Sequence, residues 1–513
     1  TEGPLYKVRS VSITGNVVLD SAALLSGLKM TSGKAFSFTS LDADVSSLKD
    51  AYGHIGRIDA VVTPSTIFAL DAPEVDVRYR LEEGATITIG EIDVFGNDKT
   101  RDSVIRRDLK FYPGQTFDTD ALTLSRKRLQ RLAYFSSLTI EPEQAPPGTS
   151  PRNVSVSVEE TPTGQFSIGA GISSNSGLMG YISFSQRNFD YARPARSFRD
   201  IVEGRAWAGG GQSFSLEAAP GSELSQVRMN FRNPRVNDSD YSFGLELHLW
   251  ERERDTYNER RAGGGISVGK QFTDNAFWEL SLAADNVRVS SIENWAPPDV
   301  FAVRGTSEVN TLGLTLGHDT RDSFVMPSEG HRLIANVENS SEILASEFDF
   351  TRLRLEGNWY RTVRRDKFDR PTVLSTRTKF AYMFADGDEN APIFERYFAG
   401  GAFDVRGFQY RGLGPRQGGE PLGGKFLAIG GLQYEVPLVG EYFRGALFYD
   451  AGTLLDTPGD LTADEIRHTV GFGIRFIIPP PLNMPVLLDF GFVLKDSDQD
   501  ETQVFSFSMG RSI

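Results

Sequence analysis

Apolar and polar side chains alternate along the chain from about residue 164 to residue 513. In 227–232, Val, Met and Phe alternate with Arg and Asn, and in 469–476, Val, Phe and Ile alternate with Thr, Gly and Arg. Segments of this kind are roughly 8–12 residues long, the length of a tilted strand that crosses a membrane. The pattern therefore predicts antiparallel strands that each have one apolar and one polar face.

A membrane β-barrel accounts for this pattern better than a soluble β-sandwich does. Sandwich strands are usually shorter, and long loops recur here, at 290–308 and 385–394. A barrel also explains the mean hydropathy of -0.28, because only alternate residues face lipid. At roughly 22 residues per strand with its connection, the region holds about 16 strands. No run of about 18 apolar residues occurs, so the sequence predicts no transmembrane helix.

The chain before this region contains an internal repeat. Residues 8–16 recur 81 positions later as 89–97, and residues 77–83 recur as 154–160 at an offset of 77. Each copy opens with an alternating strand that ends at Gly-Asn, which is a turn signal. Shared spacing over this many positions indicates two copies of one domain.

The repeat predicts two α+β domains of the order β-α-α-β-β, residues 1–84 and 85–163, followed by an all-β transmembrane barrel at 164–513. A short helix begins near Asp20 or Asp102, each a possible cap. The order resembles the POTRA domain, the polypeptide-transport-associated module. Its open strand edge suits pairing with an extended peptide, and a role as a plain spacer is the alternative. The remaining predicted elements are strands at 9–13, 57–62, 75–81, 90–94, 137–141 and 154–158, and helices at 41–52 and 119–132.

Composition and charge narrow the range of functions. The net charge of -14 provides no basic field that would attract phosphates, so we expect no nucleic-acid partner. Residues 419–425 approach a phosphate-binding loop but lack its Ser or Thr and its helix. Residues 496–500 approach a calcium loop, but Glu501 stands at the glycine position, so a solvated loop is predicted. Cys is absent, and no zinc spacing occurs among His54, His248, His318, His331 and His468. We therefore predict no catalytic residue, no metal and no cofactor.

One motif points to a family. Val405-Arg406-Gly407-Phe408 lies within 396–416, which reads RYFAGGAFDVRGFQYRGLGPR. FYDAG follows at 448–452 and FSFSMG at 505–510. These segments, in this order and after the repeat, resemble the BamA-type outer-membrane assembly factors. The resemblance covers essentially the whole chain.

The resemblance implies assembly and insertion of β-barrel proteins into the bacterial outer membrane, without nucleotide hydrolysis. The implied partners are unfolded outer-membrane proteins, periplasmic lipoproteins of an assembly complex and outer-membrane lipid, with the POTRA domains in the periplasm. Members of this family usually carry more than two POTRA domains. Two also fit the transporters of two-partner secretion, which export a polypeptide and resemble this family. Those normally add a plug helix, and none precedes Tyr6, so we prefer the assembly function.

The resemblance also implies a weak lateral seam between the first and last barrel strands. We predict these strands at 165–173 and 504–511, with fewer backbone hydrogen bonds between them than between their neighbours. Gly510 is the expected flexible point, because glycine weakens a strand. Parity places on the lipid face Phe166, Ile168, Phe505, Phe507 and Met509.

Arg406 is the residue with the most specific predicted contact. The resemblance implies that the loop with the VRGF motif folds back into the barrel lumen. Parity independently places Glu435 and Asp450 on the lumen face of adjacent strands. A guanidinium bonds a carboxylate through two parallel contacts, which Lys cannot reproduce. We therefore predict that Arg406 contacts Glu435, Asp450 or both, that Gly407 allows a tight turn and that Phe408 packs on the inner wall.

Overall fold

The structure is a computed structural model that describes residues 5–324, 326–440, 442–478 and 484–509. It contains two compact units. The first comprises Thr1–Thr163 with Arg187–Gly211, and the second comprises Gly164–Gln186 with Gln212–Ile513. The segment Arg187–Gly211, which connects two barrel strands, thus belongs to the first unit rather than to the barrel unit. It contains helix α5 (Phe198–Val202).

The first unit holds two copies of one fold. In each copy the first strand pairs in parallel with the last, and the middle strand pairs antiparallel at the other side, giving the orders β1-β3-β2 and β4-β6-β5. The shared order confirms the predicted repeat. The elements are β1 (Lys7–Thr14), α1 (Ser21–Ser26), α2 (Phe38–Gly53), β2 (Val61–Phe68), β3 (Glu74–Glu82), β4 (Ile89–Phe95), α3 (Asp102–Arg106), α4 (Thr119–Arg131), β5 (Phe135–Pro142) and β6 (Arg152–Glu160).

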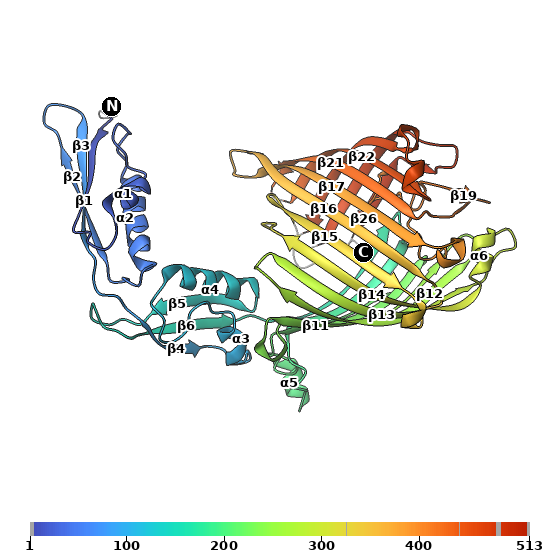
Figure 1. The fold of residues 1–513 in the computed structure, drawn as a ribbon, viewed down its shortest axis with the longest axis horizontal. Helices are drawn as coiled ribbons and strands as arrows, with labels where there is room; N and C mark the ends of the chain where they lie inside the picture. Colours follow the sequence, from blue (N-terminus) through green and yellow to red (C-terminus); the bar gives the residue numbers. More distant parts are fainter. Residues whose placement is uncertain (1–4, 325, 441, 479–483, 510–513) are drawn as a thin grey trace. The chain divides into compact units, whose positions relative to one another are not determined.

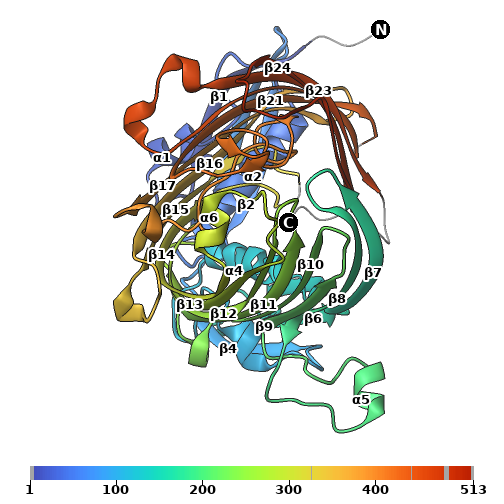
Figure 2. The ribbon, with the colours of Figure 1, turned by 90° about the vertical axis from the view of Figure 1, so that its right-hand side faces the viewer.

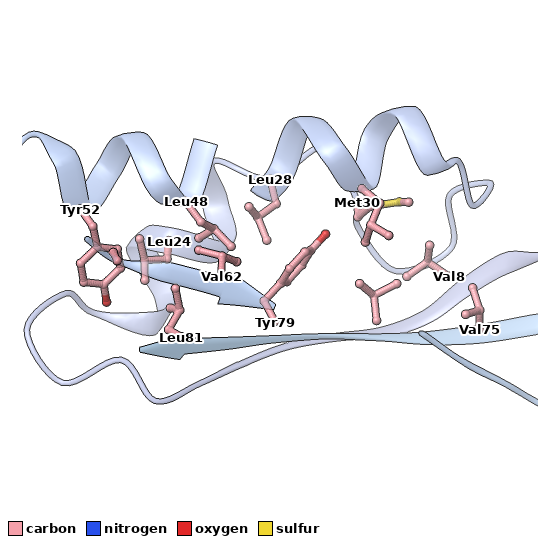
Figure 3. Packing of buried hydrophobic residues seen from close by; sticks show 13 residues of the cluster. Val8, Leu24, Leu28, Met30, Leu48, Tyr52, Val62, Val75, Tyr79 and Leu81 are labelled. Atoms are coloured by element: carbon pink, nitrogen blue, oxygen red, sulfur yellow. The ribbon is translucent and has the colours of Figure 1, made fainter. Parts of the chain in front are cut away.

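Each copy folds because the alternate residues of its central strand meet the helices that cover one face of the sheet. In the first copy, Val75 and Tyr79 of β3 and Leu48 and Tyr52 of α2 are fully buried in one core. Figure 3 shows these side chains between the helices and the sheet. The sequence places apolar residues at every second position of the strand and at every third or fourth position of the helix, so that both elements bury one face.

Two local predictions in this unit need correction. The predicted strand at 57–62 is wrong, because this segment turns at Arg57, whose backbone N–H donates to Tyr52 O, and the strand starts only at Val61. Asp20 does cap α1, accepting from Ala22 N and Ala23 N. Asp102 is instead the first residue of α3, and the position equivalent to Asp20 is held by Arg101, which makes no side-chain cap bond.

The second unit is a barrel. Sixteen antiparallel strands of the described chain close into one wall, which confirms the predicted barrel and its strand number (Figures 1 and 2). Among the described residues, no helix has the length and apolar character needed to cross a membrane. The strands are β7 (Gly164–Ser173), β8 (Gly177–Phe189), β9 (Gln212–Ala219), β10 (Leu224–Asn233), β11 (Tyr241–Glu253), β12 (Asn258–Gln271), β13 (Ala276–Ser290), β14 (Gly305–Asp319), β15 (Gly330–Ser340), β16 (Phe350–Arg365), β17 (Pro371–Ala385), β21 (Phe426–Val439), β22 (Phe443–Leu455), β23 (Arg467–Ile478), β24 (Met484–Lys495) and β26 (Phe505–Met509).

The two faces of the wall differ as the alternation predicts. One register row joins Leu432, Tyr449 and Val470, which are all exposed on the outside. The neighbouring row along the strands points to the lumen. It joins Asp450 to Thr469, and both side chains are fully buried. Because period-two alternation holds across neighbouring strands, the barrel presents an apolar outer band and a polar lumen.

Candidate functional site

The middle of the long segment between β17 and β21, residues 386–425, lies inside the barrel, whereas 386–389 and 417–419 are exposed. It contains β18 (Gly407–Phe408), which pairs with β25 (Thr502–Gln503), the short strand just before β26. Val405 and Phe408 are fully buried in one cluster with residues on the lumen face of the wall, namely Leu427, Ile429 and Leu454. We call residues 386–425 the VRGF loop. Its lumenal position is what the resemblance implied.

Arg406 is the centre of this site. Its Nε lies 2.7 Å from Asp450 Oδ2 and its Nη2 2.9 Å from Asp450 Oδ1, a two-pronged contact between a 6% exposed arginine and a fully buried carboxylate. Its Nη1 donates to Gln433 Oε1 at 2.8 Å, and the guanidinium carbon lies 3.5 Å from the centre of the Phe448 ring. The predicted contact with Asp450 is confirmed. A guanidinium so enclosed satisfies charge, hydrogen bonds and ring stacking together.

Gly407 allows the backbone to pass close to the wall. Its φ is +94°, and a Cβ at this position would lie 2.8 Å from Thr469 Cγ2. On the neighbouring wall strand β24, a Cβ on Gly491 would lie 2.6 Å from Gly407 N. Both glycines are therefore required by the close approach of the loop to the wall.

Glu435 is not a partner of Arg406. Its carboxylate pairs with Arg444 and accepts from Gln433 Nε2 at 3.1 Å. Gln433 thus bridges Arg406 and Glu435. Parity correctly puts Glu435 on the lumen face, but its carboxylate forms an ion pair with Arg444 of the adjacent strand β22 instead of with Arg406.

Several residues of the site escaped the sequence prediction. Asp489 of β24 lies 2.6 Å from Arg475 Nη2 and 3.8 Å from Arg406 Nη1. Arg377 of β17 donates to the carbonyls of Phe403 and Asp404 in the VRGF loop. The alternation of Asp489 with Leu488 and Phe490 was a usable signal for its lumenal position, whereas nothing in the sequence indicates which lumenal acid meets which arginine.

The outer part of the VRGF loop is held by further buried ion pairs. Glu395 is nearly fully buried between Arg261 and Arg352 of the wall. Asp500, predicted to lie in a solvated loop, is instead buried, because it accepts from Arg467 Nε at 2.6 Å and from Gly414 N at 3.0 Å. The prediction of a solvated loop is wrong at this residue.

The seam between the first and last barrel strands is described as far as Met509. Within the described residues, which end at Met509, the register pair Ser173 with Ser508 joins β7 to β26. Ser174 adds a backbone bond to Phe507 O at 3.0 Å. Phe166, Ile168 and Phe505 are exposed on the outer face, at 68%, 69% and 43%, and Phe507 is partly buried. Gly510 lies outside the described residues, and the Met509 side chain is not described.

The first unit brings together three side chains that could supply ligands to a metal ion. His54 Nδ1 lies 3.5 Å from Asp118 and 3.3 Å from Asp120, across the junction of the two copies. Histidine spacing along the chain does not reveal this group, because His54 is far in sequence from the two aspartates. They are partly or fully exposed, and we assign no site to them.

Comparisons with known proteins agree with this architecture. Residues 207–513 match the model of the Omp85 superfamily domain, and 6–84 and 87–161 match the POTRA model, described as a surface antigen variable number repeat. Outer membrane protein assembly factor BamA of Nitratidesulfovibrio vulgaris is 25% identical, over 99% of this chain and 62% of that protein. BamA of Neisseria meningitidis is 23% identical, over 99% and 67%. This chain thus spans about two thirds or less of the length of these relatives.

Solved structures share the fold. The crystal structure of BamA from Haemophilus ducreyi lacking POTRA domains 1-3 matches with a TM-score of 0.73 at 18% identity, covering 98% of this chain and 100% of that one. CdiB from Acinetobacter baumannii matches with a TM-score of 0.58 at 12% identity, covering 99% and 90%. At these identities the matches concern the fold alone.

Proposed function

Because the chain belongs to the Omp85 superfamily, with POTRA repeats ahead of a 16-stranded barrel, we propose that it assembles and inserts β-barrel proteins in the bacterial outer membrane. The barrel lies in that membrane and the POTRA domains lie in the periplasm. The name of the BamA relatives, assembly factor, supports the proposal. The observation that carries it is the combination of two POTRA copies with a closed 16-stranded barrel, in which the first strand, β7, meets the last, β26.

In the proposed mechanism the seam opens laterally. An unpaired strand edge offers a row of backbone N–H and C=O groups, and an extended segment of an unfolded client can pair with it. The free edge of β7 then becomes the template for the first client strand. Insertion is driven by strand pairing and by burial of apolar residues in lipid, so no nucleotide is hydrolysed.

The VRGF loop positions the moving strand in this proposal. β18 pairs with Thr502–Gln503, directly before Phe505, where β26 starts. Arg406 anchors the same loop to Asp450 on the wall. The loop therefore holds the start of β26, close to the register pair of Ser508 with Ser173 of β7.

The proposed partners are unfolded outer-membrane proteins, periplasmic lipoproteins of an assembly complex and outer-membrane lipid. Strand β2 is an edge of the first POTRA sheet, and its Val61, Ile67 and Phe68 side chains are exposed. Such an edge suits pairing with an extended client or a partner segment.

A disulfide across the seam tests the proposal. The chain has no Cys, so Ser173→Cys with Ser508→Cys introduces one defined pair at the register position that joins β7 to β26. We expect the oxidised protein in liposomes to stop inserting a client barrel, and reduction to restore insertion. The matched control is Ser167→Cys with Ser183→Cys, a register pair within the β7–β8 hairpin, which should insert clients in both redox states.

Full activity of the protein locked across the seam would refute the opening. Export of a soluble polypeptide without insertion of barrels by the reduced protein would instead favour the alternative function, a two-partner-secretion transporter.

A further inference from the structure

The outer wall of the barrel carries a groove with a floor of small side chains. One register row crosses it from His318 through Leu333, and its next four members are Gly357 of β16, Thr378 of β17, Gly430 of β21 and Ala451 of β22. The parity of this row is that of the exposed apolar residues, so it faces lipid. A Cβ on Gly430 would meet no atom within 4 Å, which marks open space above the floor.

Larger side chains form the walls of this groove. Leu355 and Phe380 stand on one side, and Trp359 stands on the other, with its indole leaning over Gly357. Leu461 and Ile466, from the loop between β22 and β23, border one end. The cavity has a volume of about 810 Å³. The lining also includes Glu356 and Lys379, whose parity is opposite to that of the floor row, and the Lys379 ammonium lies 3.4 Å from Asp404 of the VRGF loop.

The dimensions select among possible occupants. The walls stand two residues to either side of the floor row, about 13 Å apart along the strands. Their own side chains take up part of this width, and the space left is narrower than a helix of about 10–12 Å diameter. A client strand would need free backbone edges, yet β16, β17 and β21 are paired on both sides. The floor from Leu333 to Ala451 crosses four strand spacings, about 19 Å. Half the hydrocarbon core of a membrane is about 15 Å thick, so the floor is long enough for an acyl chain of one leaflet.

Polar groups mark one end of the groove. His318 lines the cavity, and its Nδ1 lies 2.8 Å from His331 Nε2. Strand directions alternate around the barrel, so β14 ends at the rim where β7 begins. That rim is the periplasmic one, because the POTRA domains precede β7. We propose that the groove holds one acyl chain of a phospholipid from the periplasmic leaflet, with the headgroup at the His318 end.

Lipid retention measures this site directly. We expect full-length protein, exchanged thoroughly into detergent, to keep one phospholipid per chain in native mass spectrometry. Gly430→Leu places a side chain where a Cβ meets no atom within 4 Å, and it should reduce the retained phospholipid several-fold. The control Leu282→Phe adds volume to the exposed outer face of β13, away from the groove, and should retain lipid like the parent protein. Heat-modifiable mobility on gels reports that each variant is folded.

Fluorescence supplies the second readout. In a variant with Trp359 as its single tryptophan, phospholipid brominated on its acyl chains should quench emission in dilute detergent, and Gly430→Leu should weaken the quenching. Three outcomes would overturn the site: no lipid on the parent protein, equal retention by folded Gly430→Leu, or retention of lipopolysaccharide in place of phospholipid. The proposal rests only on the outer-membrane location, and insertion activity is measured separately.

Discussion

The most constrained side chain in the barrel is Arg406, which meets Asp450, Gln433 and the Phe448 ring away from water. Removing it leaves the buried Asp450 carboxylate without its two-pronged partner, and breaking a buried pair costs about 3–5 kcal/mol. Lys keeps the charge but cannot make both contacts. The anchoring of the VRGF loop therefore depends on the guanidinium shape as well as on charge.

We expect Arg406→Ala to lower the unfolding free energy of the barrel by about 3–5 kcal/mol, and Arg406→Lys to recover only part of that loss. Urea titration followed by heat-modifiable mobility measures both. Arg361→Ala, at an exposed position of β16, is the control and should shift stability by no more than about 0.5 kcal/mol. Unchanged stability of Arg406→Ala would contradict the assigned contact.

At this scale the sequence predicts the face of a residue but not its partner. Alternation alone puts Glu435, Gln433 and Asp450 in the lumen, and the motif selects Arg406. The choice of Asp450 over Glu435 depends on Arg444, which reaches Glu435 from the neighbouring strand. Such a choice follows from side-chain reach across the register, which a linear pattern does not contain.

Among the elements, the turn before α2 of the first POTRA copy depends on one buried acid. Asp44 accepts from Lys29 N at 2.6 Å, Met30 N at 3.0 Å and the Tyr79 hydroxyl at 2.9 Å. Burial, together with the bond to Asp44, raises the pKa of the Tyr79 phenol. In the second copy, Ser125 stands 81 positions later and accepts from Lys110 N at 2.7 Å.

We expect Asp44→Ala to destabilise the first copy by several kcal/mol, since each buried donor left unpaired costs about 1–3 kcal/mol. Asp44→Ser, the side chain that the second copy uses, should retain part of the stability. Limited proteolysis of the full chain over a temperature series measures both. Cleavage of Asp44→Ala at the same temperature as the parent protein would show that the hydrogen bonds to Asp44 are dispensable.

A second element-scale contact joins the two copies. Asp59, ahead of β2, accepts from Arg152 of β6 at 2.7 and 2.8 Å and from Gly148 N at 2.8 Å. The hydrogen bonds from Arg152 lower the pKa of the Asp59 carboxyl. Because the folded-state pKa lies below the unfolded value of about 3.9, this stabilisation is present at neutral pH and is lost as pH falls below that value.

We therefore expect the junction to loosen in acid. Hydrogen exchange at Ile87, whose amide donates to Gly56 O across the junction, should accelerate relative to its intrinsic rate when pH falls from neutral through about 4. Asp59→Asn should already exchange faster at neutral pH and respond less to acid. The exposed Asp98→Asn is the control. Equal protection of Ile87 in Asp59→Asn and the parent protein would show that the contact between Asp59 and Arg152 does not stabilise the junction.

The repeat offset predicts both POTRA copies and their order, because core positions at fixed spacing survive in the sequence. The misplaced strand at 57–62 and the assumed cap at Asp102 show where this fails. Short apolar runs suit a turn or a strand equally. Asp102 lies one position past the cap, which Arg101 occupies with nearly the same backbone angles as Asp20.

For the whole molecule, alternation and length predict the barrel and its strand number, since lipid on one side requires period two along every strand. They do not predict that Arg187–Gly211 belongs with the POTRA unit. That assignment rests on contacts between residues far apart in sequence, such as Asn188 Nδ2 to Thr100 Oγ1 at 2.9 Å and Arg101 N to Gly209 O at 2.9 Å. No local pattern marks them.

The lumenal VRGF loop has an electrical consequence. A 16-stranded barrel whose interior is empty conducts ions as a porin does, but here Val405 and Phe408 fill part of the cross-section and Arg406 is neutralised by Asp450. In planar bilayers we expect currents well below those of an open porin of equal strand number, with larger and noisier steps for Arg406→Ala. A parent protein that conducts like a porin would show that the loop leaves the lumen. On this reasoning, the same guanidinium that anchors the loop also limits leakage of solutes across the outer membrane.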